Sequence, residues 1–199
     1  YEDTPAYSYY PGKEKTCEYR EGLYIGYRYY DTAGVKVKYP FGYGLSYTTF
    51  AYQNLEVSRK QVRLTVRNTG SVDGAEVVQI YIGKPDSHIF RPKKELKGFQ
   101  KVFLKAGESR TITIPLDDKA FRYFDIKTNH WEIKSGCYRV MAASNVEDIR
   151  LEKEIRIEGN SIAENAVNAK KLPSYWSGKI QSVSDEEFEA LLGHSIPDG

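Results

Sequence analysis

Polar and apolar side chains alternate in short runs through the middle of the chain, residues 50–158. The clearest run is Gln61–Asn68, and a period of two residues is typical of a half-buried strand. The other runs are rich in β-branched and aromatic residues, and turn residues separate them. The pattern predicts strands at 61–68, 76–82, 96–104, 110–116, 136–142 and 151–157. About seven short strands in a stretch of this length predict an all-β fold, an immunoglobulin-like β-sandwich.

The same alternation predicts which side chains form the core of the sandwich. Successive side chains of a strand point to opposite faces, so the apolar set of each run shares one face. That face is expected to be buried. The predicted core residues are Val62, Leu64, Val66, Val78, Ile80, Ile82, Ile112, Ile114 and Val140.

The first 49 residues, here called the aromatic strap, have a different character. Thirteen of the chain's 17 tyrosines lie in the first 52 residues, and Gly and Pro residues interrupt the strap repeatedly. This punctuation predicts loops with short extended pieces. So much aromatic surface is unfavourable in water and indicates an interface with a neighbouring domain. The candidate interface residues are Tyr24, Tyr27, Arg28, Tyr29, Phe41, Tyr43 and Tyr47.

Residues 159–199 are predicted to form an extended linker, 159–183, and one short helix. Ser184 and Glu187 have the spacing of a capping box, and Val183 and Phe188 have that of a hydrophobic staple. Gly193 is expected to end the helix. A helix of about ten residues is unstable alone in water, so it must pack on the sandwich or on a part outside this chain.

Bulk composition excludes several classes of function. The formal charge is only +2 and the basic residues are scattered, so the sequence predicts no basic surface for binding nucleic acid. No apolar run is long enough to span a membrane. Cys17 and Cys137 lie far apart, make no metal-ligand spacing and are expected to be unbonded. The chain starts at Tyr1 without Met and is expected to be a fragment, so its compartment, cytoplasmic or secreted, stays open.

The sequence offers little catalytic chemistry. His88, His130 and His194 fall in predicted loops without partners that would make a metal site. No phosphate-binding loop or nucleophile elbow is present, so no cofactor and no metal are expected. The acidic groups 117–118, 147–148 and 185–187 sit at strand ends or in a first helical turn, where structural roles are the better interpretation.

Two tryptophans could stack on sugars. Trp131 lies in a hairpin-like segment and Trp176, beside a tyrosine, lies in the predicted linker. A core cap for the first and an interface anchor for the second are the more common roles of such residues. Both remain weak sugar-stacking candidates.

Several motifs resemble one enzyme family in their order along the chain. Residues 21–31 and 40–50 look like the junction that follows the second catalytic domain of glycoside hydrolase family 3 enzymes. Residues 91–99, 102–109 and 121–125, the last shortly before Trp131, resemble that family's fibronectin type III-like domain. The resemblance covers roughly residues 1–158, and the tail from Ser184 to Pro197 resembles an extension of some bacterial members.

The resemblance implies a retaining β-glucosidase as the parent enzyme, with a β-xylosidase as the alternative. The family's Asp nucleophile and Glu acid/base belong to two domains that commonly precede this region, and neither motif occurs here. No catalytic residue is therefore assigned. The implied domains are 1–49, the end of the preceding α/β catalytic domain; 50–158, a fibronectin type III-like sandwich; and 159–199, a linker with a helix.

The role implied for the chain is non-catalytic: it would brace catalytic domains of the same polypeptide, which would bind the β-glucoside substrate. The alternatives are a carbohydrate-binding module and a protein-interaction sandwich. A sugar-binding module predicts a tryptophan that responds to glycans. An interaction sandwich predicts an exposed apolar sheet face.

Overall fold

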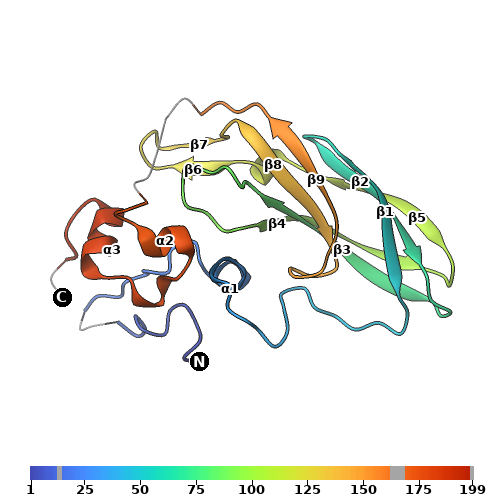
Figure 1. The fold of residues 1–199 in the computed structure, drawn as a ribbon, viewed down its shortest axis with the longest axis horizontal. Helices are drawn as coiled ribbons and strands as arrows, with labels where there is room; N and C mark the ends of the chain where they lie inside the picture. The colour runs from blue at the N-terminus through green and yellow to red at the C-terminus, as the bar shows by residue number, and fades with distance from the viewer. Residues whose placement is uncertain (13–14, 162–168, 198–199) are drawn as a thin grey trace. The chain divides into compact units, whose positions relative to one another are not determined.

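The computed structural model describes residues 1–12, 15–161 and 169–197 and divides the chain into two compact units (Figure 1). The first unit comprises 1–37, 87–93 and 164–199, and the second comprises 38–86 and 94–163. The aromatic strap is thus shared between them. Its first three quarters lie in the unit that holds the C-terminal segment, and its remainder lies in the strand-rich unit.

The second unit is a sandwich of two antiparallel sheets. The three-stranded sheet has the order β1-β2-β5, and the four-stranded sheet has the order β4-β3-β8-β9. The bounds are β1 Phe50–Val57, β2 Gln61–Asn68, β3 Gly74–Gly83, β4 Glu95–Leu104, β5 Ser109–Pro115, β8 Gly136–Ala143 and β9 Ile149–Ile157. The predicted fold class is confirmed, and the six predicted strand ranges correspond to β2, β3, β4, β5, β8 and β9.

A small hairpin interrupts this pattern between β5 and β8. The 3₁₀-helix η1 (Asp118–Ala120) leads into β6 (Tyr123–Asp125), which pairs with β7 (His130–Glu132). The Asp117 carboxylate caps η1 by accepting from the Lys119 amide at 2.9 Å. The hairpin brings Trp131 opposite Phe124.

All nine predicted core residues are buried in one cluster between the sheets, each with at most 4% of its surface exposed. Aromatic side chains complete the core, among them Phe121 and Tyr138, whose rings meet edge to face. The Tyr138 hydroxyl donates to the Lys134 carbonyl at 2.7 Å, so its polar end has a partner inside the unit.

The strand β1 was not singled out by the alternation, and its geometry explains why. Its pairing with β2 shifts register between Gln53 and Glu56, and Asn54 adopts a positive φ of 54°. A bulge of this kind inserts an extra residue and moves the following side chains to the other face. The period of two is therefore broken in the middle of the strand.

Two predictions of irregular structure were wrong in the first unit. The strap contains a helix, α1 (Tyr27–Ala33), between Gly26 and Gly34, both at positive φ. The predicted linker, of which 162–168 lie outside the described residues, contains α2 (Pro173–Ser177) and the 3₁₀-helix η2 (Ile180–Ser182). Each element has seven residues or fewer, so its stability comes from tertiary packing and not from a helical sequence pattern.

The third helix, α3 (Asp185–Leu192), follows its predicted start and stop signals. The Ser184 hydroxyl accepts from the Glu187 amide at 3.2 Å, and Gly193 ends the helix in the left-handed conformation. Val183 and Phe188 are both buried. The helix packs into an apolar cluster of the first unit, whose buried members are Tyr24, Tyr29, Leu172, Tyr175, Ile180, Val183 and Phe188.

Both cysteines are free thiols: Cys17 is exposed in the first unit, and Cys137 is partly exposed on β8.

Candidate functional site

The end of the strap presents a continuous run of exposed apolar side chains on the second unit. Every second residue from Tyr39 to Tyr47 is large and apolar, with exposures from about half to complete. The intervening positions are Pro, Gly or Ser. This run contains three of the predicted interface residues, Phe41, Tyr43 and Tyr47. Contiguous apolar surface of this kind marks interaction sites in soluble proteins.

The backbone under this run is fixed to the sandwich. The Gln79 amide donates to the Ser144 carbonyl at 2.6 Å and to the Gly42 carbonyl at 3.3 Å. The Val146 amide donates to the Phe41 carbonyl at 2.9 Å. Gly42 has a φ of 81°, and a Cβ there would overlap the Gln79 amide. The exposed side chains thus project from an ordered main chain.

The far end of the run is anchored in the same way. Thr48 is buried, and its hydroxyl donates to Asn68 Oδ1 at 2.6 Å. A Cβ on Gly70 or Gly74 would overlap the Thr48 side chain. The chain therefore enters β1 with its direction set by these contacts.

A second exposed group adjoins the first. Phe99 and Phe103 on the edge strand β4 are both more than half exposed, and Lys101 lies between them. Phe99 pairs with Gln79 in the sheet register, so the two side chains share a face. Since Gln79 binds the Gly42 carbonyl, the two apolar groups meet at this residue. An exposed apolar sheet face is the feature expected of an interaction sandwich.

The other predicted interface residues lie in the first unit and are largely internal to it. Tyr24 and Tyr29 are buried, whereas Tyr27 and Arg28 are half-buried on α1. The Tyr24 hydroxyl donates to the Tyr175 carbonyl, and burial raises the pKa of Tyr24 well above its ordinary value. These rings hold the strap against the C-terminal segment.

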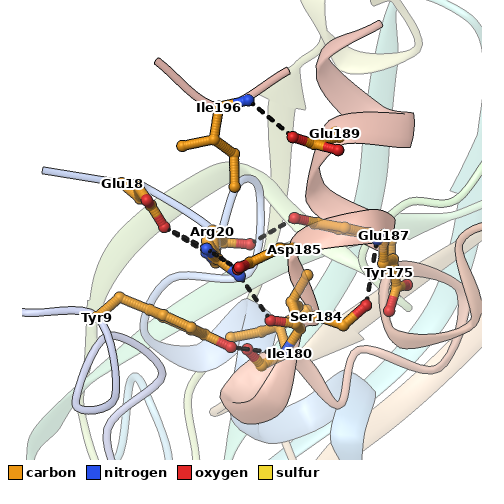
Figure 2. A network of polar contacts seen from close by, with 11 residues as sticks. Tyr9, Glu18, Arg20, Tyr175, Ile180, Ser184, Asp185, Glu187, Glu189 and Ile196 are labelled. Atoms are coloured by element: carbon orange, nitrogen blue, oxygen red, sulfur yellow. Dashed lines mark hydrogen bonds and ion pairs between the residues drawn. The ribbon is translucent and has the colours of Figure 1, made fainter. Parts of the chain in front are cut away.

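Arg20 is the centre of the polar contacts in the first unit (Figure 2). Its guanidinium donates to Glu18 Oε2 at 2.6 Å, to the Val183 carbonyl at 2.9 Å and to Asp185 Oδ1 at 2.5 Å. Burial disfavours the charge, but the hydrogen bonds to Asp185 and Glu18 outweigh it and raise the pKa of Arg20. The charged group also lies 5.1 Å from the centre of the Phe188 ring.

The backbone around Arg20 is held as well. Its carbonyl accepts from the Tyr175 hydroxyl at 2.9 Å, and the Tyr9 hydroxyl donates to the Ile180 carbonyl at 3.1 Å. Sequence reasoning missed this network because the partners of Arg20 in the C-terminal segment lie 155 to 165 residues away along the chain. The one local signal was the acidic first turn of α3, which favours a nearby cation.

The Glu187 carboxylate differs from the expected capping box. Its two oxygens accept from the Ser174 amide and the Ser174 hydroxyl, both at 2.7 Å. They therefore satisfy the open N-terminus of α2 and not that of their own helix. The contact explains why a five-residue helix forms at this place.

The acidic groups considered for catalysis are engaged structurally. Asp117 caps η1, and Asp118 pairs with Arg122 at 3.0 Å. Asp148 pairs with Arg150 at 2.7 Å, and Asp185 belongs to the Arg20 network. Within residues 1–12, 15–161 and 169–197, no three His, Cys, Asp or Glu side chains gather as a metal site. No helix in that part of the chain is long and apolar enough to cross a membrane.

The two tryptophans have different surroundings. Trp176 packs against the apolar cluster of the first unit, and its Nε1 is buried. Trp131 is 55% exposed on β7, and its indole contacts Arg122 and Phe124. Only Trp131 combines an exposed ring with an adjacent hollow.

Comparison with known proteins adds an independent line of evidence. The family model described as "Fibronectin type III-like domain" matches residues 76–146. Thermostable beta-glucosidase B of Acetivibrio thermocellus is 38% identical over 95% of this chain and 25% of its own length. An exo-alpha-(1->6)-L-arabinopyranosidase of Bifidobacterium breve is 45% identical over 79% of this chain and 22% of its own length.

Solved structures agree. The crystal structure of a GH3 beta-glucosidase from Bifidobacterium adolescentis superposes with a TM-score of 0.76 at 40% identity, over 90% of this chain and 28% of that one. The chain thus spans about a quarter of the length of these relatives. The family-model match, the sequence identities and the shared fold identify the chain as a fibronectin type III-like region, with its flanks, of the glycoside hydrolase family 3 proteins.

Proposed function

We propose that this chain is the non-catalytic brace of a larger family 3 glycosidase and docks against the catalytic domains of the same polypeptide. The observation that carries the proposal is the exposed run from Tyr39 to Tyr47 on a fixed backbone. About three quarters of the length of this chain's relatives lies outside the matched region. Domains of the same polypeptide could therefore cover this surface.

The parent activity is proposed to be retaining hydrolysis of terminal β-D-glucosyl residues. Several relatives named β-glucosidases support this, whereas two others are named exo-alpha-(1->6)-L-arabinopyranosidases. A β-xylosidase is the alternative parent. Substrate would bind to the catalytic domains and not to the exposed run.

The energetics favour docking over exposure. Burying a large apolar side chain contributes about 1.5–3 kcal/mol relative to leaving it in water. Leu45 and Tyr47 are almost entirely exposed in this chain. If the upstream domains cover both, removing the two side chains should destabilise the whole enzyme by about 3–6 kcal/mol.

The test is the double variant Leu45→Ser, Tyr47→Ser in the full-length polypeptide. We expect the melting temperature to fall by about 2–4 °C, while kcat on an aryl β-glucoside changes little. The matched control is Ile126→Ser, a largely exposed apolar residue on the β6–β7 turn. A double variant with the same melting temperature as the control and the wild type would refute the proposal that this surface docks on the catalytic domains.

The 199-residue chain alone is expected not to hydrolyse aryl β-glucosides, because its acidic pairs serve as caps and ion-pair partners. Turnover that survives rigorous purification and disappears when an Asp or Glu of this chain is mutated would contradict this assignment.

A further inference from the structure

A hollow of about 370 Å³ opens beside the β6–β7 hairpin of the sandwich unit. It is not part of the apolar run proposed for docking. Trp131 contributes the largest ring, and charged or amide side chains surround it. The lining residues are Arg59, Asp118, Arg122, Trp131, Ile133, Glu158, Gly159 and Asn160.

The indole of Trp131 is held in a defined orientation. The Arg122 guanidinium lies 4.5 Å from the centre of the ring, within the range of a cation–π contact. Arg122 is itself paired with Asp118 at 3.0 Å. The Phe124 ring meets the indole at 73° with the ring centres 5.4 Å apart. Little orientational freedom remains to be lost when a ligand binds.

Another part of the lining is held by hydrogen bonds of the main chain. The Ile133 amide donates to Asn160 Oδ1 at 2.8 Å, and the Ser161 amide donates to the Ile133 carbonyl at 3.1 Å. The Gly159 amide donates to the Ser135 hydroxyl at 2.9 Å. A Cβ on Gly159 would overlap the Ile133 carbonyl, so only glycine permits this close approach.

The chemistry of the lining indicates a neutral polyhydroxylated ligand. Two guanidinium groups and two carboxylates balance in charge, and Asn160 adds an amide whose NH₂ group is a donor. An anion or a nucleic acid would need a net positive site. Planar donors and acceptors beside a half-exposed indole match a sugar, which has hydroxyls around its rim and C–H groups on its faces.

We propose that this hollow is a saccharide-binding subsite, in which a pyranose ring of a neutral glycan stacks on Trp131 while Arg59, Arg122 and Glu158 bind its hydroxyls. The choice of β-glucans as test ligands rests on the proposed function of the parent enzyme. The inference that the hollow binds a neutral sugar rests on its lining residues alone. Such a site would hold the enzyme near its polymeric substrate. A single stacking site of this kind is expected to bind with a Kd on the order of 1 mM.

The experiment is affinity electrophoresis of the full-length polypeptide in native gels that contain hydroxyethylcellulose, mixed-linkage β-glucan or arabinoxylan. We expect at least one polymer to retard the wild type. Trp131→Ala should weaken that retardation at least tenfold in apparent Kd, and Trp131→Tyr should retain part of it. Glu158→Ala provides a second variant, because this side chain is exposed and the Arg59 contact uses its main-chain carbonyl.

The matched control is Ile126→Ala, which removes another exposed apolar side chain of the same hairpin but does not line the hollow. Its retardation should equal that of the wild type. All variants should keep the wild-type kcat/KM on an aryl β-glucoside, which separates this site from the catalytic centre. A full-length wild type that does not hydrolyse aryl β-glucosides would contradict the proposed function, and the retardation result would still decide whether the hollow binds a glycan.

Three outcomes would overturn the subsite. The first is no retardation by any of the polymers. The second is equal retardation of wild type, Trp131→Ala and Glu158→Ala. The third is a Trp131→Ala variant that melts several degrees lower with unchanged retardation, which would make the hairpin a protein-packing surface instead.

Discussion

Replacing Arg20 by Met should destabilise the first unit by about 2–4 kcal/mol. Arg20 is 5% exposed, and its loss leaves the buried Val183 carbonyl without its donor, which costs about 1–3 kcal/mol. The pair with Asp185 contributes no more than about 1 kcal/mol, because that carboxylate is two-thirds exposed. Glu18 is less exposed, so losing its partner adds to the cost.

Methionine is chosen because it keeps an apolar stem of similar length. The Arg20 side chain lies against the rings of Tyr9 and Phe188, and the methionine can retain part of that packing. The expected loss therefore reports on the charged group and its hydrogen bonds.

Hydrogen exchange of the intact polypeptide measures this effect locally. Peptides from 172–192 should exchange about 30-fold faster or more, since 2 kcal/mol corresponds to about that factor. Peptides from β2 and β3, in the other unit, should keep their rates. The control is Arg63→Met, whose pair with Glu56 is about half exposed and whose loss should stay below about 0.5 kcal/mol. Exchange in 172–192 that matches this control would refute the reasoning.

Two further predictions concern the sandwich. Leu64→Ala should destabilise it by about 2–5 kcal/mol, because Leu64 is fully buried in the core; a loss below about 0.5 kcal/mol in a denaturant titration would contradict this. Burial raises the pKa of Glu76 above 4.5, although the hydrogen bond from Tyr52 opposes the shift. A carboxyl group whose pKa is raised in the folded protein favours folding while it is protonated. That contribution is fully present below its ordinary pKa and is lost as pH rises through its raised pKa in the folded protein. Glu76→Gln should therefore be more stable than wild type at pH 7 and equal to it near about pH 4; a constant difference across the pH range would exclude this.

The sandwich was predictable because its information is local. In β2, the alternation places Val62, Leu64 and Val66 on one face, and this predicts both the strand and the side chains that it contributes to the core. All three are buried in the structure. The same logic failed at β1, where the bulge near Asn54 displaces the pattern. A bulge depends on the partner strand as well as on the sequence of the bulged strand.

The first unit was predictable only at α3, where Ser184 and Gly193 mark the helix ends in the sequence itself. The helix α2 depends on Glu187, thirteen residues away, to satisfy its first amides. The site of Arg20 depends on Val183 and Asp185, more than 160 residues away. No window along the chain contains both sides of such contacts, so the sequence supplied the aromatic residues of the strap without their partners.

This distribution of contacts bears on how the chain is organised. The C-terminal segment packs on the same cluster as the beginning of the strap, through Tyr24, Tyr175 and Phe188. If the strap is the end of the preceding catalytic domain, as the family resemblance implies, the C-terminal helices complete that domain after the sandwich has been inserted between them. Along the chain, the sandwich is then preceded and followed by parts of the first unit. A module connected twice is held more firmly than one on a single linker, because the second connection limits the conformations open to it, and this favours a brace over a freely tethered binding module.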